Sequence, residues 1–217
     1  MRDLDLDGST NRVVGTITAR FPGHMVHIDV NGVGRIPDGG GHRVHGRHSA
    51  QKRAAQRAKT AGAKAGYVFL HSIVDGYSRL ADTEHLPGAK ASTTVGFYSR
   101  ARVFLRAHGT ERVVTVVTDN RANYRAKDFT RVITATASRH QYIRAYTSRH
   151  SGKAERYNRT LAAELLYAHV WTSEDQRAAA IQRWNIHDNY HRNHTARTPT
   201  PASRLGPHVT NVMSQNN

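Results

Sequence analysis

The feature that most constrains the fold is a strand-like apolar run that ends on an acid. Residues 113–119 read VVTVVTD, a β-branched run closed by Asp119. Residues 25–30, MVHIDV, alternate apolar and polar side chains and predict a second strand that ends at Asp29. Because ligands and catalytic groups usually gather at strand ends in α/β sheets, we expect both carboxylates at a functional edge.

The rest of the chain alternates strand and helix patterns. Two strand-like runs flank the turn at residues 76–78 and predict a β-hairpin. We therefore expect Asp75 to be a turn residue and not a metal ligand. Further segments predict helices at 91–109, 127–137, 152–169 and 173–190, a strand at 140–146, and an irregular Pro/Thr-rich tail at 191–206. This order predicts an α/β fold, a mixed sheet covered by helices.

The charge balance points to a polyanionic partner. Lys and Arg number 32 against 16 Asp and Glu, for a net charge of +16 and an isoelectric point of about 10.9. Nucleic acid is the expected partner, since no apolar run is long enough to span a membrane and no signal peptide is recognisable. The absence of Cys fits a cytoplasmic protein.

A basic stretch follows the first strand. From Gly39 to Val74 there is no acidic residue. This composition fits either a solvated, mobile loop or a nucleic-acid contact surface. The candidate DNA-binding residues in it are Arg43, Arg47, Lys52, Arg53 and Arg57.

A third acid, Glu155, lies in the first turn of the helix predicted at 152–169, after 35 residues that separate it from Asp119. Three carboxylates brought together repel one another unless a cation is present, and oxygen ligands of this kind suit Mg²⁺ or Mn²⁺. Two such ions about 4 Å apart support in-line phosphoryl displacement. Ordinary ion pairs are the alternative explanation for such acids.

These segments together resemble a known family. The runs VHIDV, VTDNRANYR and SGKAERYNRT, with flanks GRIPDGGGHRVHGR, SIVDGYSRL and YHRNHTARTPTPASRL, resemble DDE transposases of bacterial insertion sequences and integrase catalytic cores. The resemblance covers roughly residues 22–206. It implies a ribonuclease-H-like, mixed five-stranded sheet flanked by helices. It also implies two Mg²⁺ or Mn²⁺ ions held by Asp29, Asp119 and Glu155, with Asp29 bridging both.

The resemblance further implies an activity and a setting. Such proteins cleave DNA at transposon ends to leave a 3′-hydroxyl, which then attacks target DNA. We therefore expect transposon ends and target DNA as partners, a homo-oligomer assembled on DNA, and a place in the bacterial cytoplasm at the nucleoid. The expected organisation is an irregular arm at 1–22, a catalytic core at 23–170 with a basic insertion at about 39–66, and a C-terminal helix and tail at 171–217.

Basic residues around Glu155 are candidate phosphate contacts. Arg159 lies four residues after Glu155 and shares its helix face, while Lys153 and Arg156 flank that face. Such contacts would supply affinity and register without sequence readout. A surface ion pair between Glu155 and Arg159 is the alternative.

Three departures from the family bear on activity. Before the third acid, Thr147-Ser148 stands where relatives often have Thr-Pro, so a Pro that would rigidify the loop is absent. Arg121 follows Asn120 where relatives have Gly, so we expect a strained turn there. The first strand begins after only 24 residues, so we expect a truncated copy or one that depends on another chain to recognise transposon ends. The alternatives are therefore an impaired remnant that binds DNA non-specifically and a nuclease that only hydrolyses.

Two further motifs are set aside. DLDLDG, at residues 3–8, starts like a calcium-binding loop, but Val14 stands where the bidentate carboxylate should be. HDNYH, at residues 187–191, imitates a zinc-protease helix but lacks its Glu.

Overall fold

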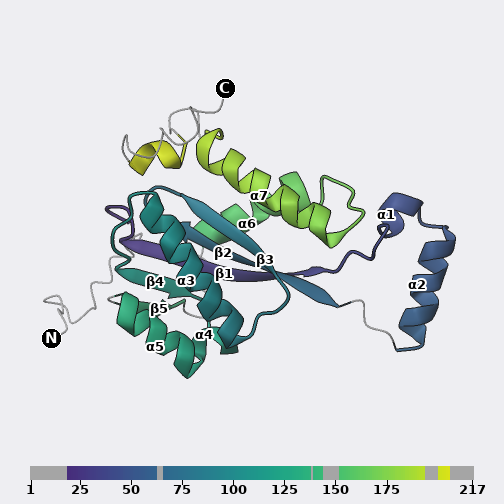
Figure 1. Cartoon of the computed structure of the whole chain (residues 1–217), viewed down its shortest axis with the longest axis horizontal. Coiled ribbons are helices and arrows are strands. Elements are labelled where there is room, and N and C mark those ends of the chain that lie inside the picture. Colours follow the sequence, from purple (N-terminus) through teal and green to yellow (C-terminus); the bar gives the residue numbers. More distant parts are fainter. Residues whose placement is uncertain (1–18, 63–65, 138, 144–151, 194–199, 206–217) are drawn as a thin grey trace, which may run out of the picture.

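The fold is built on one mixed five-stranded sheet (Figure 1). The computed structural model describes residues 19–62, 66–137, 139–143, 152–193 and 200–205, so DLDLDG and most of the N-terminal arm lie outside the described residues. The strands are β1 (Met25–Gly34), β2 (Tyr67–Asp75), β3 (Ala81–Leu86), β4 (Thr115–Thr118) and β5 (Arg139–Tyr142). Their order is β3-β2-β1-β4-β5, with β1, β2 and β3 antiparallel and β1, β4 and β5 parallel. The predicted mixed sheet is confirmed.

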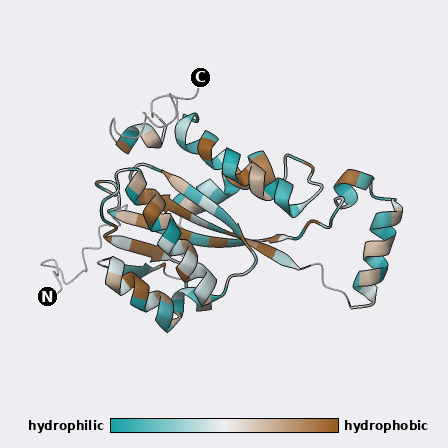
Figure 2. Ribbon diagram, in the orientation of Figure 1, coloured by the Kyte–Doolittle hydropathy of each residue, from teal (hydrophilic) through white to brown (hydrophobic). Residues whose placement is uncertain are grey.

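Helices cover both faces of this sheet. On one face, α3 (Ala91–Ala107), α4 (Ala122–Arg125) and α5 (Lys127–Thr136) pack on Val26, Ile28 and Val30 of β1. On the other face lie α6 (Gly152–Leu161), the π-helical turn η2 (Ala162–Leu166) and α7 (Glu174–Tyr190). Figure 2 shows apolar residues concentrated on the strands and on the helix faces turned toward them. Since β1 alternates its side chains, Asp29 points to the side of α6.

The position of Asp29 within β1 differs from the prediction. The strand does not end there but continues to Gly34, because β2 pairs with β1 from Val26 to Gly34. By contrast, β4 pairs only with residues 25–27 of β1. Asp29 therefore lies in mid-strand, beside the point where β4 ends and Asp119 follows. The prediction that Asp119 closes its strand is confirmed.

The β2–β3 connection is a hairpin, as predicted. The buried Asp75 carboxylate accepts hydrogen bonds from the backbone N–H groups of Gly23, Tyr77 and Ser78 and from the Ser78 hydroxyl, at 2.7 to 3.2 Å. Its oxygens are thus committed to the turn, which explains an acid at that position without a metal.

The interpretation of the basic stretch as a mobile loop is wrong for most of its length. It forms α1 (His42–His45) and α2 (Ala50–Thr60), and the Ser49 side chain caps α2 by accepting from the Lys52 N–H at 3.1 Å. Alanines with Lys, Arg and Gln favour a helix even where nothing is buried. Neither helix has a buried residue, and Figure 1 shows them projecting beyond the far ends of β1 and β2.

Smaller boundaries also differ. The long helix predicted at 152–169 ends as α6 at Leu161 and continues as η2 to Leu166, and the predicted irregular tail contains the 3-10 helix η3 (Ala202–Leu205). The strand predicted at 140–146 is β5, and residues 144–146 lie outside the described part of the chain. In the described residues no helix is both long and apolar enough to cross a bilayer.

Candidate active site

Two acids from neighbouring strands form the centre of the candidate site. Asp29 is partly buried on β1, and its Oδ1 accepts the Val30 backbone N–H at 2.8 Å. Burial raises the pKa of Asp29, and the nearby Asp119 carboxylate raises it further, while Arg121 opposes both. Burial and the same two carboxylates also raise the pKa of Tyr124, whose ring is buried on α4. The two acids therefore lie close enough to repel one another.

Arg121 supplies the cation that these acids require. Its Nε lies 3.0 Å from Asp119 Oδ2, and its Nη1 donates to the Val30 carbonyl oxygen on β1. The Arg121 backbone N–H donates to Asp119 Oδ1 at 2.9 Å. The expected strain is absent, because Arg121 has φ −61° and ψ 154°, an extended conformation open to any residue, and precedes α4 as its N-cap. Its guanidinium thus bridges the residue that follows β4 and the middle of β1.

Helix α6 contributes a third polar group. Asn158 Nδ2 donates to Asp29 Oδ2 at 2.8 Å. Glu155 is exposed in the first turn and lies three residues before Asn158, so the two share a helix face. Asn158 had no assigned role in the sequence interpretation, although its i+3 spacing from Glu155 was the available signal.

A buried hydrogen-bond chain fixes α6 against the sheet. The Tyr157 hydroxyl donates to Asn185 Oδ1 on α7 at 2.8 Å and lies 2.7 Å from Thr83 Oγ1 on β3. Thr83 Oγ1 lies 2.8 Å from Ser72 Oγ on β2, at the position that pairs with Asp29. The ring of Tyr157 packs edge-on against Trp184. This network holds the Asn158 face of α6 over Asp29.

The donor chemistry fits a hard divalent cation at the two strand acids. Asp29 and Asp119 offer carboxylate oxygens of the type that Mg²⁺ and Mn²⁺ prefer, and their mutual repulsion shows a demand for positive charge. In this arrangement Arg121 meets that demand. Among the residues described, no three His, Cys, Asp or Glu side chains form a group able to hold a metal ion, so Glu155 is not assembled with the strand acids here.

The predicted DNA-binding residues lie in two places. Lys52, Arg53 and Arg57 are exposed on α2, with Arg43 on α1 and Arg47 after it, all at the projecting end of the molecule. Arg43 Nη2 donates to the Tyr167 carbonyl oxygen at 2.7 Å, which ties α1 to the segment after η2.

The other three residues lie on α6. Arg159 is exposed in the last turn, on the face of Glu155. Lys153 turns away from that face, and its Nζ donates to the Gly76 carbonyl oxygen at 2.8 Å. Burial, and then the charge of Arg79, lower the pKa of Lys153. Arg156 is exposed and lines a cavity beside Lys153.

One family model matches part of the sequence. A model of the integrase core domain family matches residues 136–199, which include α6 and α7. No curated protein matches the sequence.

Solved structures show the same fold. A chain of the simian T-cell lymphotropic virus intasome, solved in complex with PP2A regulatory subunit B56 gamma, has a TM-score of 0.61 at 18% identity over 88% of this chain. This chain spans 57% of the length of that one. The HTLV-2 integrase catalytic core domain in complex with magnesium has a TM-score of 0.56 at 16% identity, covering 86% of this chain and 98% of that domain. The BIV integrase catalytic core domain has a TM-score of 0.52 at 14% identity, covering 83% and 92%. The protein thus has the ribonuclease-H-like fold of integrase catalytic cores, and the family match supports a DDE integrase-type domain.

Proposed function

We propose that this chain is the catalytic core of a bacterial insertion-sequence transposase, which cleaves DNA at transposon ends and joins the resulting 3′-hydroxyl to target DNA. The match to the integrase core domain and the retroviral integrase neighbours support a function in DNA integration or transposition. The observation that carries the proposal is the juxtaposition of Asp29 and Asp119 at the end of β4, with α6 held over them.

We assign each side chain a role in this chemistry. Asp29, Asp119 and Glu155 would hold two Mg²⁺ or Mn²⁺ ions, as the HTLV-2 domain was solved with magnesium. When bound, such ions activate an attacking oxygen and stabilise a leaving one. Asn158 orients Asp29, because its hydrogen bond to Oδ2 and that of the Val30 N–H to Oδ1 together fix the plane of the carboxylate.

DNA contact would come from basic residues on both sides of this centre. Arg159 lies one turn after Glu155 on the same face of α6, and the exposed cations of α2 form a second basic surface at the projecting end. Their phosphate contacts would position the duplex, and assembly as a homo-oligomer would bring two transposon ends together.

A second candidate function is DNA binding without catalysis by an impaired copy of the same fold. Arg121 is the observation in its favour, because its guanidinium already neutralises Asp119 and reaches across to β1. A metal ion would have to displace it. The third alternative, a nuclease that only hydrolyses, has no separate structural support.

A joining assay separates these functions. The protein would be incubated with Mn²⁺, a supercoiled plasmid and a pool of labelled duplexes with randomised termini, in parallel with an Asp119→Asn variant. Covalent joining of label to plasmid that the variant loses supports the transposase. Salt-sensitive DNA binding without joining or cleavage supports the non-catalytic alternative. Plasmid cleavage without joined label supports the nuclease.

A further inference from the structure

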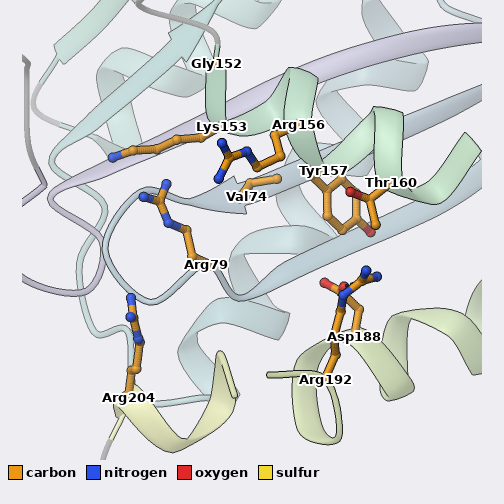
Figure 3. Close-up of a pocket in the computed structure, with 10 residues that line it drawn as sticks. All are labelled: Val74, Arg79, Gly152, Lys153, Arg156, Tyr157, Thr160, Asp188, Arg192 and Arg204. Carbon is orange, nitrogen blue, oxygen red and sulfur yellow. Dashed lines mark ion pairs between the residues drawn. The ribbon is translucent and has the colours of Figure 1, made fainter. Parts of the chain in front are cut away.

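A second polar site lies on the other side of α6 from the strand acids. One side of α6, the β2–β3 turn, the end of α7 and η3 line a cavity of about 460 Å³ (Figure 3). Its lining contains one acid, Asp188, and five cations: Arg79, Lys153, Arg156, Arg192 and Arg204. This surplus of positive charge has no role in the proposed chemistry.

Three of the five cations are engaged by the protein. Arg192 pairs with Glu164 and lies 3.5 Å from Asp188 Oδ1. Lys153 donates to the Gly76 carbonyl oxygen at 2.8 Å, and Arg204 Nη1 donates to the Tyr77 carbonyl oxygen at 3.1 Å. The last two contacts hold the β2–β3 turn against α6 and η3.

The guanidinium groups of Arg79 and Arg156 are the remaining charges. Within the part of the chain that the structure describes, neither makes a hydrogen bond or an ion pair with another residue. Burial, then the like charges of Arg204 and Arg156, lower the pKa of Arg79. Figure 3 shows the ends of the Arg79 and Arg156 side chains directed toward one another. Asp75 is the acid whose charge opposes this lowering at Arg79, and its oxygens are committed to the turn.

The backbone at Arg79 is also unusual. Its φ is 72°, and among the described residues it is the one non-glycine residue with a positive φ. This left-handed conformation is unfavourable for a residue with a Cβ, so the turn holds Arg79 in a strained backbone conformation. The strained backbone therefore holds an arginine in the lining of the cavity, where its guanidinium faces that of Arg156.

We propose that this cavity binds a phosphate group between Arg79 and Arg156, and that the phosphate belongs to a DNA strand. Two guanidinium forks match the geometry of phosphate oxygens, and an anion between them relieves their repulsion. Asn158 and Arg156 lie on opposite sides of α6, so a DNA strand that contacts both places passes around the start of this helix. The identity of the phosphate source rests on the proposed function, whereas the phosphate chemistry does not.

Two variants and one control test the proposal in the full chain. Arg79→Asn removes the charge and keeps a residue that tolerates a positive φ. Arg156→Gln removes a charge from an exposed helix position with little effect on folding. Arg106→Gln on α3 is the matched control, an exposed helix arginine on the opposite face of the sheet.

The first measurement is thermal unfolding in inorganic phosphate against chloride at equal ionic strength. Phosphate at ten times its dissociation constant should raise the Tm of the parent protein and of Arg106→Gln by about 3–6 °C. Arg79→Asn and Arg156→Gln should lose that rise. A parent protein whose Tm responds no more to phosphate than to chloride overturns the proposal.

The second measurement is fluorescence anisotropy of a labelled duplex across a range of salt. Each cavity variant should reduce the slope of log K against log salt by about 1, whereas Arg106→Gln should leave the slope unchanged. Loss of the phosphate response with an unchanged slope overturns DNA as the source and assigns the cavity to a small phosphorylated molecule. A protein that joins no DNA but shows both effects refutes the proposed function and leaves the cavity proposal standing.

Discussion

Replacing Arg121 by Gln should increase the affinity of the candidate site for Mn²⁺. In the parent protein the guanidinium contacts both Asp119 and the Val30 carbonyl oxygen. It therefore competes with a metal ion for the Asp119 carboxylate. Gln keeps a similar length and removes the charge. The backbone should tolerate the change, because φ at this position is −61°.

The size of the effect follows from the geometry. The side chains of Arg121 and Asp119 are 55% and 34% exposed, so their ion pair contributes at most about 1 kcal/mol. A divalent ion at about 2.1 Å from Asp119 Oδ2 would lie within roughly 5 Å of the Arg121 Nε, given the present 3.0 Å contact. In a water-like dielectric the repulsion at that distance is about 1.7 kcal/mol. Displacement of the ion pair corresponds to a gain in affinity of up to about 5-fold on removing Arg121, and repulsion corresponds to a gain of about 20-fold.

Isothermal titration with Mn²⁺ at fixed ionic strength measures this gain directly. Arg121→Lys, which keeps the charge, should stay within about threefold of the parent. Arg125→Gln removes an equivalent exposed charge from the end of α4 and should change the dissociation constant less than about twofold. Equal affinities for Arg121→Gln and the parent would refute the reasoning that Arg121 competes with the metal.

Three further predictions follow from buried or hydrogen-bonded polar groups. Burial raises the pKa of Asp82 to about 6, so the folded protein binds this proton more tightly than the unfolded chain does, and the free energy of unfolding falls as pH rises from about 4 to about 6. Urea unfolding at each pH should therefore show Asp82→Asn more stable than the parent by about 1–3 kcal/mol at pH 7 and equal to it below pH 4. Asp75→Ala should lower the free energy of unfolding by about 3–5 kcal/mol, because it leaves several buried hydrogen-bond donors of the turn unsatisfied. As a control, Asp128→Ala at an exposed ion pair should change the free energy of unfolding by less than about 0.5 kcal/mol. Asn158→Ala should reduce the joining rate about 10- to 100-fold by releasing Asp29, with duplex affinity changed less than twofold; an unaffected rate would exclude that positioning role.

The strand pattern predicted the sheet because its constraints are local. Alternation in MVHIDV, the β-branched run before Asp119 and the turn at 76–78 each determine how a short segment is buried. What local pattern could not predict was where β1 ends. That depends on β2, which pairs along β1 to Gly34 and so places Asp29 in mid-strand.

The contents of the site were harder to predict than its location. Arg121 was noted from the sequence as a misplaced residue expected to strain the backbone, whereas its unstrained side chain acts across the strands as a counter-ion. Asn158 binds Asp29, which lies 129 residues away along the chain. Arg79 belongs to a turn whose left-handed conformation no periodicity predicts. Helix α2 was missed because its composition, without an apolar face, indicates solvation as readily as helix.

Manganese-edge anomalous diffraction from crystals soaked in Mn²⁺ tests the central claim most directly, that Asp29 and Asp119 form a metal-dependent DNA-joining centre with Glu155. We predict anomalous density beside the carboxylates of Asp29 and Asp119, Arg121 moved away from Asp119, and no such density in crystals of Asp119→Asn. Density confined to other parts of the surface, with Arg121 still bridging β4 and β1, would contradict the account.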